Sequence, residues 1–406
     1  MRRSAVFILL CVSALAAADD LTTEFGGHTK FRVIGQSYPE DSLFRDYVGS
    51  DSLDAGADLR LNLKLNSGHW TFDTAYQMIG LQGDGLKLGG PPNDDRRLLD
   101  LTHVISEGSD NAFLHRLDRL WLGYTSEKAV VRLGRQALSW GNGLAYAPMD
   151  LVNPFDPASI DTEYKAGDDM LYVQYLQDNG NDVQAAYVFR RNVLTGESGS
   201  DEATAAVKYH GFAGEGEYDL LVARSYADAV IGVGAGRGIG GAVWSADLVV
   251  TDTDLDTYVQ FVSNVMYSWI RGGKNMSGSL EYYFNGFGQS GGRYDPVSLA
   301  ANPDLLLRFS RGELFTLGRH YLSANVMIEM SPLWILTPTV LMNIEDPSAL
   351  FQLVTTYSLS DNMAFLGSLN IPLGPSGSEF GGIESGVPDR YLSTDAGIFA
   401  QLAWYF

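Results

Sequence analysis

The C-terminal segment, which ends in Trp404-Tyr405-Phe406, restricts the possible folds more than any other part of the chain. Apolar side chains occupy every second position from Ala396 to Phe406, and Phe399 and the small Ala403 are additional apolar residues on the other face. Polar Gln401 and Tyr405 lie between them. Side chains of a β-strand point alternately to its two faces. The segment therefore predicts a strand with one apolar face and one polar face.

The same alternation recurs along most of the chain, while helical periodicity is almost absent. Between Leu59 and Leu65, for example, leucines alternate with Arg60, Asn62 and Lys64. Several such segments are longer than the five or six residues typical of strands in soluble sheets. We expect about 18 strands (16–18), at residues 24–37, 52–66, 69–82, 113–125, 129–138, 168–178, 182–192, 203–212, 215–226, 228–235, 240–251, 257–270, 276–288, 319–330, 334–344, 350–359, 362–373 and 392–406.

The connections between these strands alternate between short and long. Residues 66–68, 126–128 and 331–333 are tight turns, whereas 83–112 and 289–318 are long. This alternation, with an even strand number, is typical of outer-membrane barrels whose termini both face the periplasm. We predict an all-β fold, a transmembrane antiparallel up-and-down β-barrel of about 18 strands with periplasmic termini. The alternative is a soluble β-sandwich or propeller.

The first residues have the features of a secretion signal. Arg2 and Arg3 precede an apolar run, and Ala16-Ala17-Ala18 fits a small-residue cleavage site. The run is too short to span a bilayer as a helix. We expect residues 1–18 to be a cleaved signal peptide and 19–406 to be the barrel, placed in the outer membrane of a Gram-negative cell. Cys11, the single cysteine, would be lost with the signal.

The overall composition agrees with a membrane barrel. Hydrophobic residues make up 45% of the chain, and the formal net charge is −21. Only every second residue of a barrel strand meets lipid, so the average composition stays polar. The acidic charge argues against a nucleic-acid partner, because proteins that bind nucleic acids usually carry basic patches.

The charged residues at the predicted inward positions follow an order along the chain. Sixteen to eighteen strands leave an aqueous channel, and strand order is angular order around its wall. We predict a basic arc and an opposite acidic arc, which would set up a transverse field across the lumen. The alternative is that these charges only pair with neighbouring strands. The basic positions are Lys30, Arg32, Arg60, Lys64, Arg132, Arg135 and Arg190, and the acidic positions are Glu217, Asp219, Asp247, Glu281, Glu329, Glu345 and Asp395.

The connection 139–167 is the candidate pore constriction. It is too long for a plain connection, and prolines stiffen it. Folded into the lumen, it would bring four carboxylates toward Arg132 or Arg135, and three aromatic rings toward a passing solute. The alternative is a loop packed on the outer rim. The carboxylates are Asp150, Asp156, Asp161 and Glu163, and the aromatic residues are Tyr146, Phe155 and Tyr164.

Catalytic and metal-binding patterns are weak. Ser290 lies between glycines, but a nucleophile elbow needs a strand–turn–helix junction that this loop region does not offer. The six histidines show no metal-ligand spacing. Asp252, Asp254 and Asp256 lack the glycine and distal glutamate of a calcium-binding loop. We therefore expect no enzymatic activity, no cofactor and no metal site.

Three stretches carry a resemblance to known proteins. The C-terminal strand ending in Phe406 resembles the signal that the barrel assembly machinery recognises. Residues 133–143 (LGRQALSWGNG) with 148–155, and 281–286 with 343–348, resemble bacterial porin-like outer-membrane proteins. The Gly-Arg-Gln element at 134–136 also looks like the alginate-export family, whose barrels have eighteen strands, although the continuation at 140–143 departs from that pattern.

These observations lead to a functional hypothesis. The chain is expected to form a porin-like channel for passive diffusion of small hydrophilic solutes. The alternatives are a non-conducting surface, structural or adhesin-type barrel, and a substrate-specific exporter or importer of oligosaccharides. The expected partners are outer-membrane lipid and lipopolysaccharide, the barrel assembly machinery and the solutes. The porin resemblance adds a homotrimer as a common form of assembly.

Overall fold

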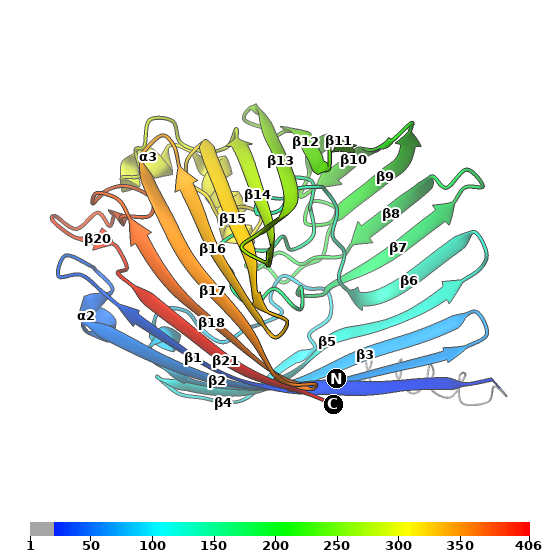
Figure 1. The fold of residues 1–406 in the computed structure, drawn as a ribbon, viewed down its shortest axis with the longest axis horizontal. Helices are drawn as coiled ribbons and strands as arrows, with labels where there is room; N and C mark the ends of the chain where they lie inside the picture. The colour runs from blue at the N-terminus through cyan, green and yellow to red at the C-terminus, as the bar shows by residue number, and fades with distance from the viewer. Residues whose placement is uncertain (1–19) are drawn as a thin grey trace.

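The structure, a computed structural model, describes residues 20–406 and is dominated by one closed antiparallel β-barrel of eighteen strands (Figure 1). The predicted signal peptide lies outside the described residues. All eighteen predicted strands are present, with boundaries that differ by a few residues. The barrel strands are β1 (Thr22–Ser37), β2 (Asp51–Ser67), β3 (Trp70–Gly83), β5 (Asn111–Thr125), β6 (Ala129–Gln136), β7 (Asp168–Leu176), β8 (Asp182–Val188), β9 (Thr204–Ala213), β10 (Gly216–Ser225), β11 (Asp228–Ile239), β12 (Ala242–Asp252), β13 (Thr257–Arg271), β14 (Lys274–Asn285), β15 (His320–Ser331), β16 (Trp334–Asn343), β17 (Ser348–Ser360), β18 (Met363–Leu373) and β21 (Gly397–Tyr405).

The ring closes where the first strand meets the last. β1 pairs with β21 from Gln36 opposite Gly397 to His28 opposite Tyr405. Beyond this ladder, Gly27 N donates to Phe406 O at 2.9 Å, and Phe406 N donates to Gly27 O at 3.1 Å. Each barrel strand therefore has a partner on both sides, so the sheet has no free edge.

The two rims of the barrel differ. One rim carries only short turns, such as 68–69, 240–241 and 332–333, and we call it the short-turn rim. The opposite, long-loop rim carries the connections 84–110, 137–167, 189–203, 286–319 and 374–396. β1 starts at the short-turn rim, since Thr22 lies opposite Asn66 at the end of β2. Phe406 lies at the same rim, because its backbone bonds to Gly27 near the start of β1.

The long connections contain short elements that alternation did not predict. They are α2 (Arg45–Val48), the 3-10 helix η1 (Asp84–Lys87), β4 (Thr102–Glu107), α3 (Pro296–Ala300), α4 (Pro303–Arg311) and the two-residue strands β19 (Ile383–Glu384) and β20 (Tyr391–Leu392). Within residues 20–406, none of the helices has the length and apolar character to cross a bilayer. Proline at the start of α3 and α4, and Asp295 and Asn302 as caps, explain where these two helices begin.

Segment 94–107, which contains β4, covers a gap in the barrel wall. β6 and β7 stop short, because the chain between them turns away from the sheet. In the space above them, β4 pairs with β5, and Arg97 forms an isolated bridge with Arg190 just beyond β8. Segment 94–107 thus bridges the upper ends of β5 and β8.

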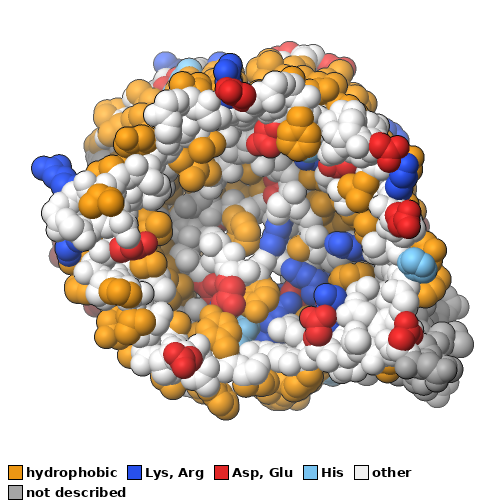
Figure 2. Space-filling view, turned by 45° about the vertical axis from the view of Figure 1, so that its right-hand side comes forward, with side chains coloured by type: hydrophobic (Ala, Val, Ile, Leu, Met, Phe, Trp, Pro, Cys, Tyr) orange, Lys and Arg blue, Asp and Glu red, His pale blue; other side chains and the backbone are white. Residues whose placement is uncertain are grey.

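The faces of the closing strand agree with the alternation. Ile398, Leu402 and Trp404 are exposed on the outside, whereas Gln401 is buried on the inside. Figure 2 shows apolar side chains over much of the outer surface and charged side chains gathered within the hollow. The pattern fits an outer face that meets hydrocarbon and an inner face that meets water.

We expect Gly27→Ala to impair closure of the ring. A Cβ atom at Gly27 would lie 2.1 Å from the backbone oxygen of Arg60 and 3.0 Å from the ring of Phe406. Overpacking of this kind costs about 1–3 kcal/mol. The measurement is the urea midpoint of unfolding, together with the fraction of compact, faster-migrating protein on an unheated denaturing gel.

Gly238→Ala in β11 is the matched control, because a Cβ atom there has no neighbour within 4 Å. Equal midpoints and folded fractions for the two variants would contradict the importance of the Gly27 contact.

Candidate functional site

The connection 139–167 lies inside the barrel. Its residues bond to inward-facing side chains of β1, β12, β14, β17 and β21, which are far apart around the ring. A segment can reach such distant strands from their inner faces only by crossing the lumen. We refer to residues 139–167 as the inner loop.

Two carboxylates on the wall hold the first half of the inner loop. Asp247 on β12 accepts from the backbone N and the side-chain Nδ2 of Asn142, both at 2.7 Å. Glu281 on β14 accepts from three successive backbone N–H groups, those of Leu144, Ala145 and Tyr146, at 2.6–2.9 Å. Both side chains are 1% exposed. A buried carboxylate needs several donors, and the inner loop supplies them.

An ion pair on the opposite wall holds the second half. Lys30 Nζ on β1 lies 2.7 Å from Asp161 Oδ2 and 2.8 Å from Glu163 Oε2. On β21, Gln401 donates to Asp161 and Tyr405 donates to Glu163, both at 2.9 Å. The inner loop is therefore fixed at both of its ends and spans the lumen between them.

Apolar packing fills the space between the inner loop and one side of the wall. Trp140 and Met149 of the loop are buried against inward side chains of β7 to β12, among them Tyr172, Leu221 and Val249. Trp140 Nε1 donates to Gln184 Oε1 at 2.7 Å. The sequence did not predict this contact, because these wall residues alternate like any other strand positions.

The four predicted loop carboxylates have different surroundings. Asp150 is buried and bonded to Lys165 of the same loop. Burial raises the pKa of Asp150 to about 6, although the Lys165 ammonium opposes this shift. Burial also acts to raise the pKa of Asp161, but the hydrogen bonds from Lys30 and Gln401 outweigh it and hold the pKa below its usual range. Asp161 therefore stays ionised near neutral pH.

Asp156 differs from the other three carboxylates. Its side chain is exposed, and among residues 20–406 it accepts only from Ala158 N. Partial burial raises its pKa, and the Ala158 N–H opposes this shift. None of the four carboxylates bonds to Arg132 or Arg135 within the described residues, so that part of the prediction was wrong. Asp161 and Glu163 pair instead with Lys30, and Asp150 pairs with Lys165.

The predicted basic arc is seen in part. Within residues 20–406, every Lys or Arg that alternation places on the inner face of the strands comes from β1 to β9. Arg60 pairs with Asp118 at 2.8 Å, and Lys64 pairs with Glu24 at 3.5 Å near the short-turn rim. Arg32 makes no ion pair with a described residue, and Arg132 stacks on Trp121 and Tyr172. Arg190 is buried against Asp168.

Arg135 does not line the lumen, contrary to the prediction. It follows outward-facing Leu133 by two positions, and it is 1% exposed. Its guanidinium bonds to Asp94, Asp169 and Leu99 O, and so ties segment 94–107 to β6 and β7. The lumen assignment was made at an irregular strand end, where Gly134 has φ of 127° and β6 ends at Gln136.

The predicted acidic positions do not form one open arc. Asp219 pairs with Lys208 and His210, and Glu329 accepts from Asn275 near the short-turn rim. Glu217 is exposed. Acids also face inward on the early strands, for example Asp58 and Asp118.

Two predicted acids lie outside the strands. Glu345 is in the turn between β16 and β17, where it accepts from Arg319 N. Asp395 is exposed before β21. Both positions were wrongly assigned to inward strand faces: β21 begins at Gly397 and not at 392, and Glu345 lies beyond the end of both β16 and the predicted strand 334–344. Asp247 and Glu281 do face inward, but they bond to the inner loop.

The aromatic residues of the inner loop are only partly accessible. Tyr146 is buried and stacks on Tyr283 with ring centroids 4.7 Å apart. Tyr164 is 38% exposed and lies under the guanidinium of Arg60, 4.2 Å from its ring centroid. Phe155 is 38% exposed. Tyr164 and Phe155 therefore remain as possible surfaces for a solute, and Tyr146 does not.

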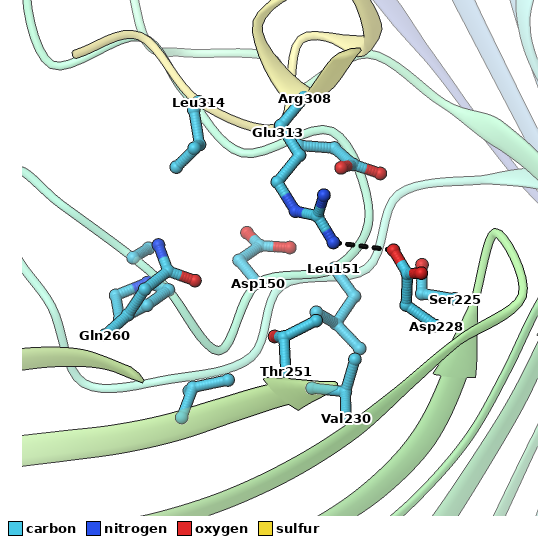
Figure 3. Close-up of a pocket in the computed structure, with 13 residues that line it drawn as sticks. Asp150, Leu151, Ser225, Asp228, Val230, Thr251, Gln260, Arg308, Glu313 and Leu314 are labelled. Atoms are coloured by element: carbon cyan, nitrogen blue, oxygen red, sulfur yellow. Dashed lines mark hydrogen bonds and ion pairs between the residues drawn. The ribbon is translucent and has the colours of Figure 1, made fainter. Parts of the chain in front are cut away.

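Helix α4 closes over the inner loop from the long-loop rim. Arg308 donates to Asp228, the first residue of β11, at 2.6 Å (Figure 3). Glu313 and Asp150 lie beside this pair and line the same small cavity of about 50 Å³ (Figure 3). No sequence pattern predicted this contact, because it depends on the fold of a loop rather than on periodicity.

A further buried carboxylate, that of Glu379, joins two connections of the long-loop rim to β15 and β16. Glu379, in the connection 374–396, accepts from Tyr321, Asn343 and Leu317 N. Burial raises the pKa of Glu379 to about 7, although these hydrogen bonds oppose the shift. No sequence pattern pointed to Glu379, which lies in a Gly- and Ser-rich stretch.

The fold is similar to that of known outer-membrane porins. A search of solved structures finds OccAB2 of Acinetobacter baumannii, with a TM-score of 0.54 and 10% identity over 95% of this chain and 98% of that one. OccK7 (OpdD) of Pseudomonas aeruginosa has a TM-score of 0.51 and 8% identity, over 95% of this chain and 98% of that one. A variant of OccD1 (OprD) has a TM-score of 0.54 and 9% identity, over 96% of both chains. At such identity, the likeness concerns the fold.

Sequence comparisons add nothing to this likeness. No family model matches the chain, and no curated protein matches it in sequence. The resemblance to alginate-export barrels therefore remains a prediction.

Replacing the wall carboxylate that holds the inner loop should loosen the loop. Glu281→Gln keeps one acceptor oxygen but removes the charge and one acceptor for three buried N–H groups. A buried donor without a partner costs about 1–3 kcal/mol. We expect backbone amides of residues 140–149 to exchange hydrogen about tenfold faster, as measured by mass spectrometry.

Glu329→Gln is the control, because Glu329 bonds to Asn275 and not to the inner loop. Unchanged exchange in Glu281→Gln, or an equal effect in Glu329→Gln, would show that Glu281 does not hold the loop.

The stability of the long-loop rim should depend on pH through Glu379. Its pKa in the folded protein is raised to about 7. Protonated Glu379 therefore contributes fully to the free energy of unfolding when the pH is below the pKa of this group in the unfolded chain. This contribution is lost as pH rises through about 7. The loss is at most of the order of 3 kcal/mol. We expect the melting temperature of the wild-type protein to fall between pH 5 and pH 8.5, and Glu379→Gln to reduce this fall.

Glu384→Gln changes an exposed carboxylate of the same connection and is the control. If Glu379→Gln retained the full pH dependence, Glu379 would not be its source.

Proposed function

We propose that this protein is an outer-membrane channel for passive diffusion of small hydrophilic solutes. The observation that carries the proposal is a closed eighteen-strand ring whose lumen is crossed by one loop fixed on two opposite walls. A ring of this size leaves an aqueous lumen, and a loop fixed inside it narrows the path. The likeness to outer-membrane porins supports both the channel and its location.

The orientation and assembly follow from the same proposal. The short-turn rim, with both chain ends, would face the periplasm after cleavage of residues 1–18, as in other barrels of this class. Phe406 would be read by the barrel assembly machinery, and the apolar outer face would meet lipid and lipopolysaccharide. A trimer is the assembly that the porin resemblance implies. We propose no catalytic role for the described residues.

Charge inside the lumen would orient the solute. The inward cations of the strands lie on β1 to β9, and Asp156 of the inner loop has an exposed side chain. A solute with polar groups of both signs has lower energy when it lies across such a field. A carbohydrate would in addition find the exposed faces of Tyr164 and Phe155, which keeps oligosaccharide transport as a more specific version of the proposal.

A non-conducting barrel is the second candidate. The packing of Trp140 and Met149 against β7 to β12 favours it, because this part of the lumen is filled by side chains. Such a barrel would serve at the cell surface through its long loops. The two candidates differ in one property, the passage of ions.

The channel should carry current, and its anion preference should depend on two unpaired arginines. Arg32 and Arg132 face the lumen without an ion-pair partner among the described residues. The double variant Arg32→Gln/Arg132→Gln should lower the ratio of chloride to potassium permeability about twofold or more, because it removes two positive charges from the wall. Reversal potentials in planar bilayers under a KCl gradient measure this ratio.

Lys128→Gln is the control, because Lys128 lies in a short turn and pairs with Asp178. Absence of stepwise current from the refolded wild-type protein would favour the non-conducting barrel. An unchanged permeability ratio in the double variant would show that the two arginines do not influence the passage of ions.

A further inference from the structure

A cavity of about 300 Å³ opens on the lumen side of the long-loop rim. Asn153 of the inner loop and inward-facing Asp168 lie in its lining, which places it inside the mouth of the barrel. The cavity lies apart from the contacts that hold the inner loop on β1, β12 and β14. Four guanidinium groups from three different connections line it, namely those of Arg96, Arg97, Arg190 and Arg311.

Two of these arginines are fixed by acids. Arg97 donates to Asp94 Oδ1 at 2.7 Å and to Gly167 O at 2.9 Å. Arg190 lies 3.2 Å from Asp168 Oδ2 and donates to Thr204 at 2.6 Å. These bonds use part of each guanidinium fork and hold the remaining N–H groups in place. The two side chains therefore form a rigid base for the cavity.

The other two arginines have no acid partner among residues 20–406. Arg96 donates to the backbone oxygen of Ser310 at 2.9 Å. Arg311 lies over the ring of Tyr226, with its guanidinium carbon 4.0 Å from the centroid. Arg190 lies 4.8 Å from the same centroid, so one ring supports two like charges. Such an arrangement is favourable when an anion lies between the cations.

Two residues that line the cavity have positive φ. Asn153 has φ of 52° and Tyr226 has φ of 49°. These are two of the five non-glycine residues with positive φ in the described chain. At Tyr226 the positive φ belongs to the two-residue turn 226–227 between β10 and β11, where such values are usual. This turn places the Tyr226 ring in contact with both Arg190 and Arg311.

The acids near the cavity do not cancel its charge. Asp94 is also bonded to Arg135, and Asp168 pairs with Arg190. Asp95 is exposed at the edge. Glu313 lies near Arg311 and Arg190 but belongs to the small cavity beside α4. Two guanidinium groups thus remain for a ligand.

We propose that this cavity, the mouth arginine site, binds the phosphoryl group of a small solute before the solute passes the inner loop. A phosphoryl group presents three terminal oxygens and can accept from several guanidinium forks at once, whereas a carboxylate presents two oxygens. The cavity holds roughly ten water volumes, enough for a phosphoryl group and a small body attached to it.

The inference rests on the proposed channel function for its purpose, but binding at the site is measured without current. A protein that binds phosphate and carries no current would contradict the channel only. A protein that carries current and binds no phosphate would contradict the site only.

The test is calorimetric titration of inorganic phosphate into the full-length protein, refolded in detergent, at low ionic strength and pH 7.5. We expect saturable binding that Arg96→Gln and Arg311→Gln each weaken about tenfold, because each loses a charge-assisted hydrogen bond. Arg224→Gln is the matched control, since Arg224 lies at the same rim, is 52% exposed and pairs with Asp201. Its binding should equal that of the wild-type protein.

Absence of saturable phosphate binding to the wild-type protein would overturn the proposal, as would equal weakening in Arg224→Gln. Glucose 6-phosphate should compete with phosphate, whereas competition by glucose or acetate at the same concentration would overturn the choice of a phosphoryl group. If a Gln variant does not give the compact band on an unheated gel, Arg96→Lys and Arg311→Lys replace it. These should weaken binding about threefold or more by loss of the planar fork, and unchanged binding would overturn the site.

Discussion

A backbone amide in hydrocarbon has no water to bond to, and the whole architecture follows from this constraint. Every strand of a sheet in such a medium needs two neighbours, and the pairing of β1 with β21 provides the last of them. Two glycines of β1, Gly26 and Gly27, allow Phe406 to lie close to the strand at this seam. The polar inner face, the rims and the inner loop all depend on the ring being closed.

Inside the ring, a different problem is solved by the inner loop. Asp247 and Glu281 would be costly to bury alone, and the backbone of a loop that crosses the lumen also needs partners. Each supplies what the other lacks, since the carboxylates accept from the loop N–H groups. The ion pairs of Lys30 complete the attachment on the far wall. Polar groups are thereby used to position the loop, and apolar groups to fill the space behind it.

Much of this fold could be predicted from the sequence, because the period of two is a local property. Alternation located all eighteen barrel strands and assigned the faces of β21 and of Arg32, Arg60 and Arg132. It failed where a strand ends or bends, as at Arg135 and Glu345. It also could not show that Asp247 and Glu281 bond to a loop more than a hundred residues away. The contacts of Glu379 and α4 depend on how long connections pack together, and no periodicity reports on that.

The early end of β6 and β7 has a consequence for the integrity of the wall. Between Gln136 and Asp168, 31 residues fold inward instead of extending the sheet. The insertion of the loop therefore leaves a gap in the side of the barrel. Segment 94–107 covers that gap, and it is held there by Arg135 and by the pairing of β4 with β5. A loop can narrow the lumen of such a barrel only if a neighbouring connection is long enough to cover the gap that the loop leaves in the wall. The lengths of the two connections are therefore coupled.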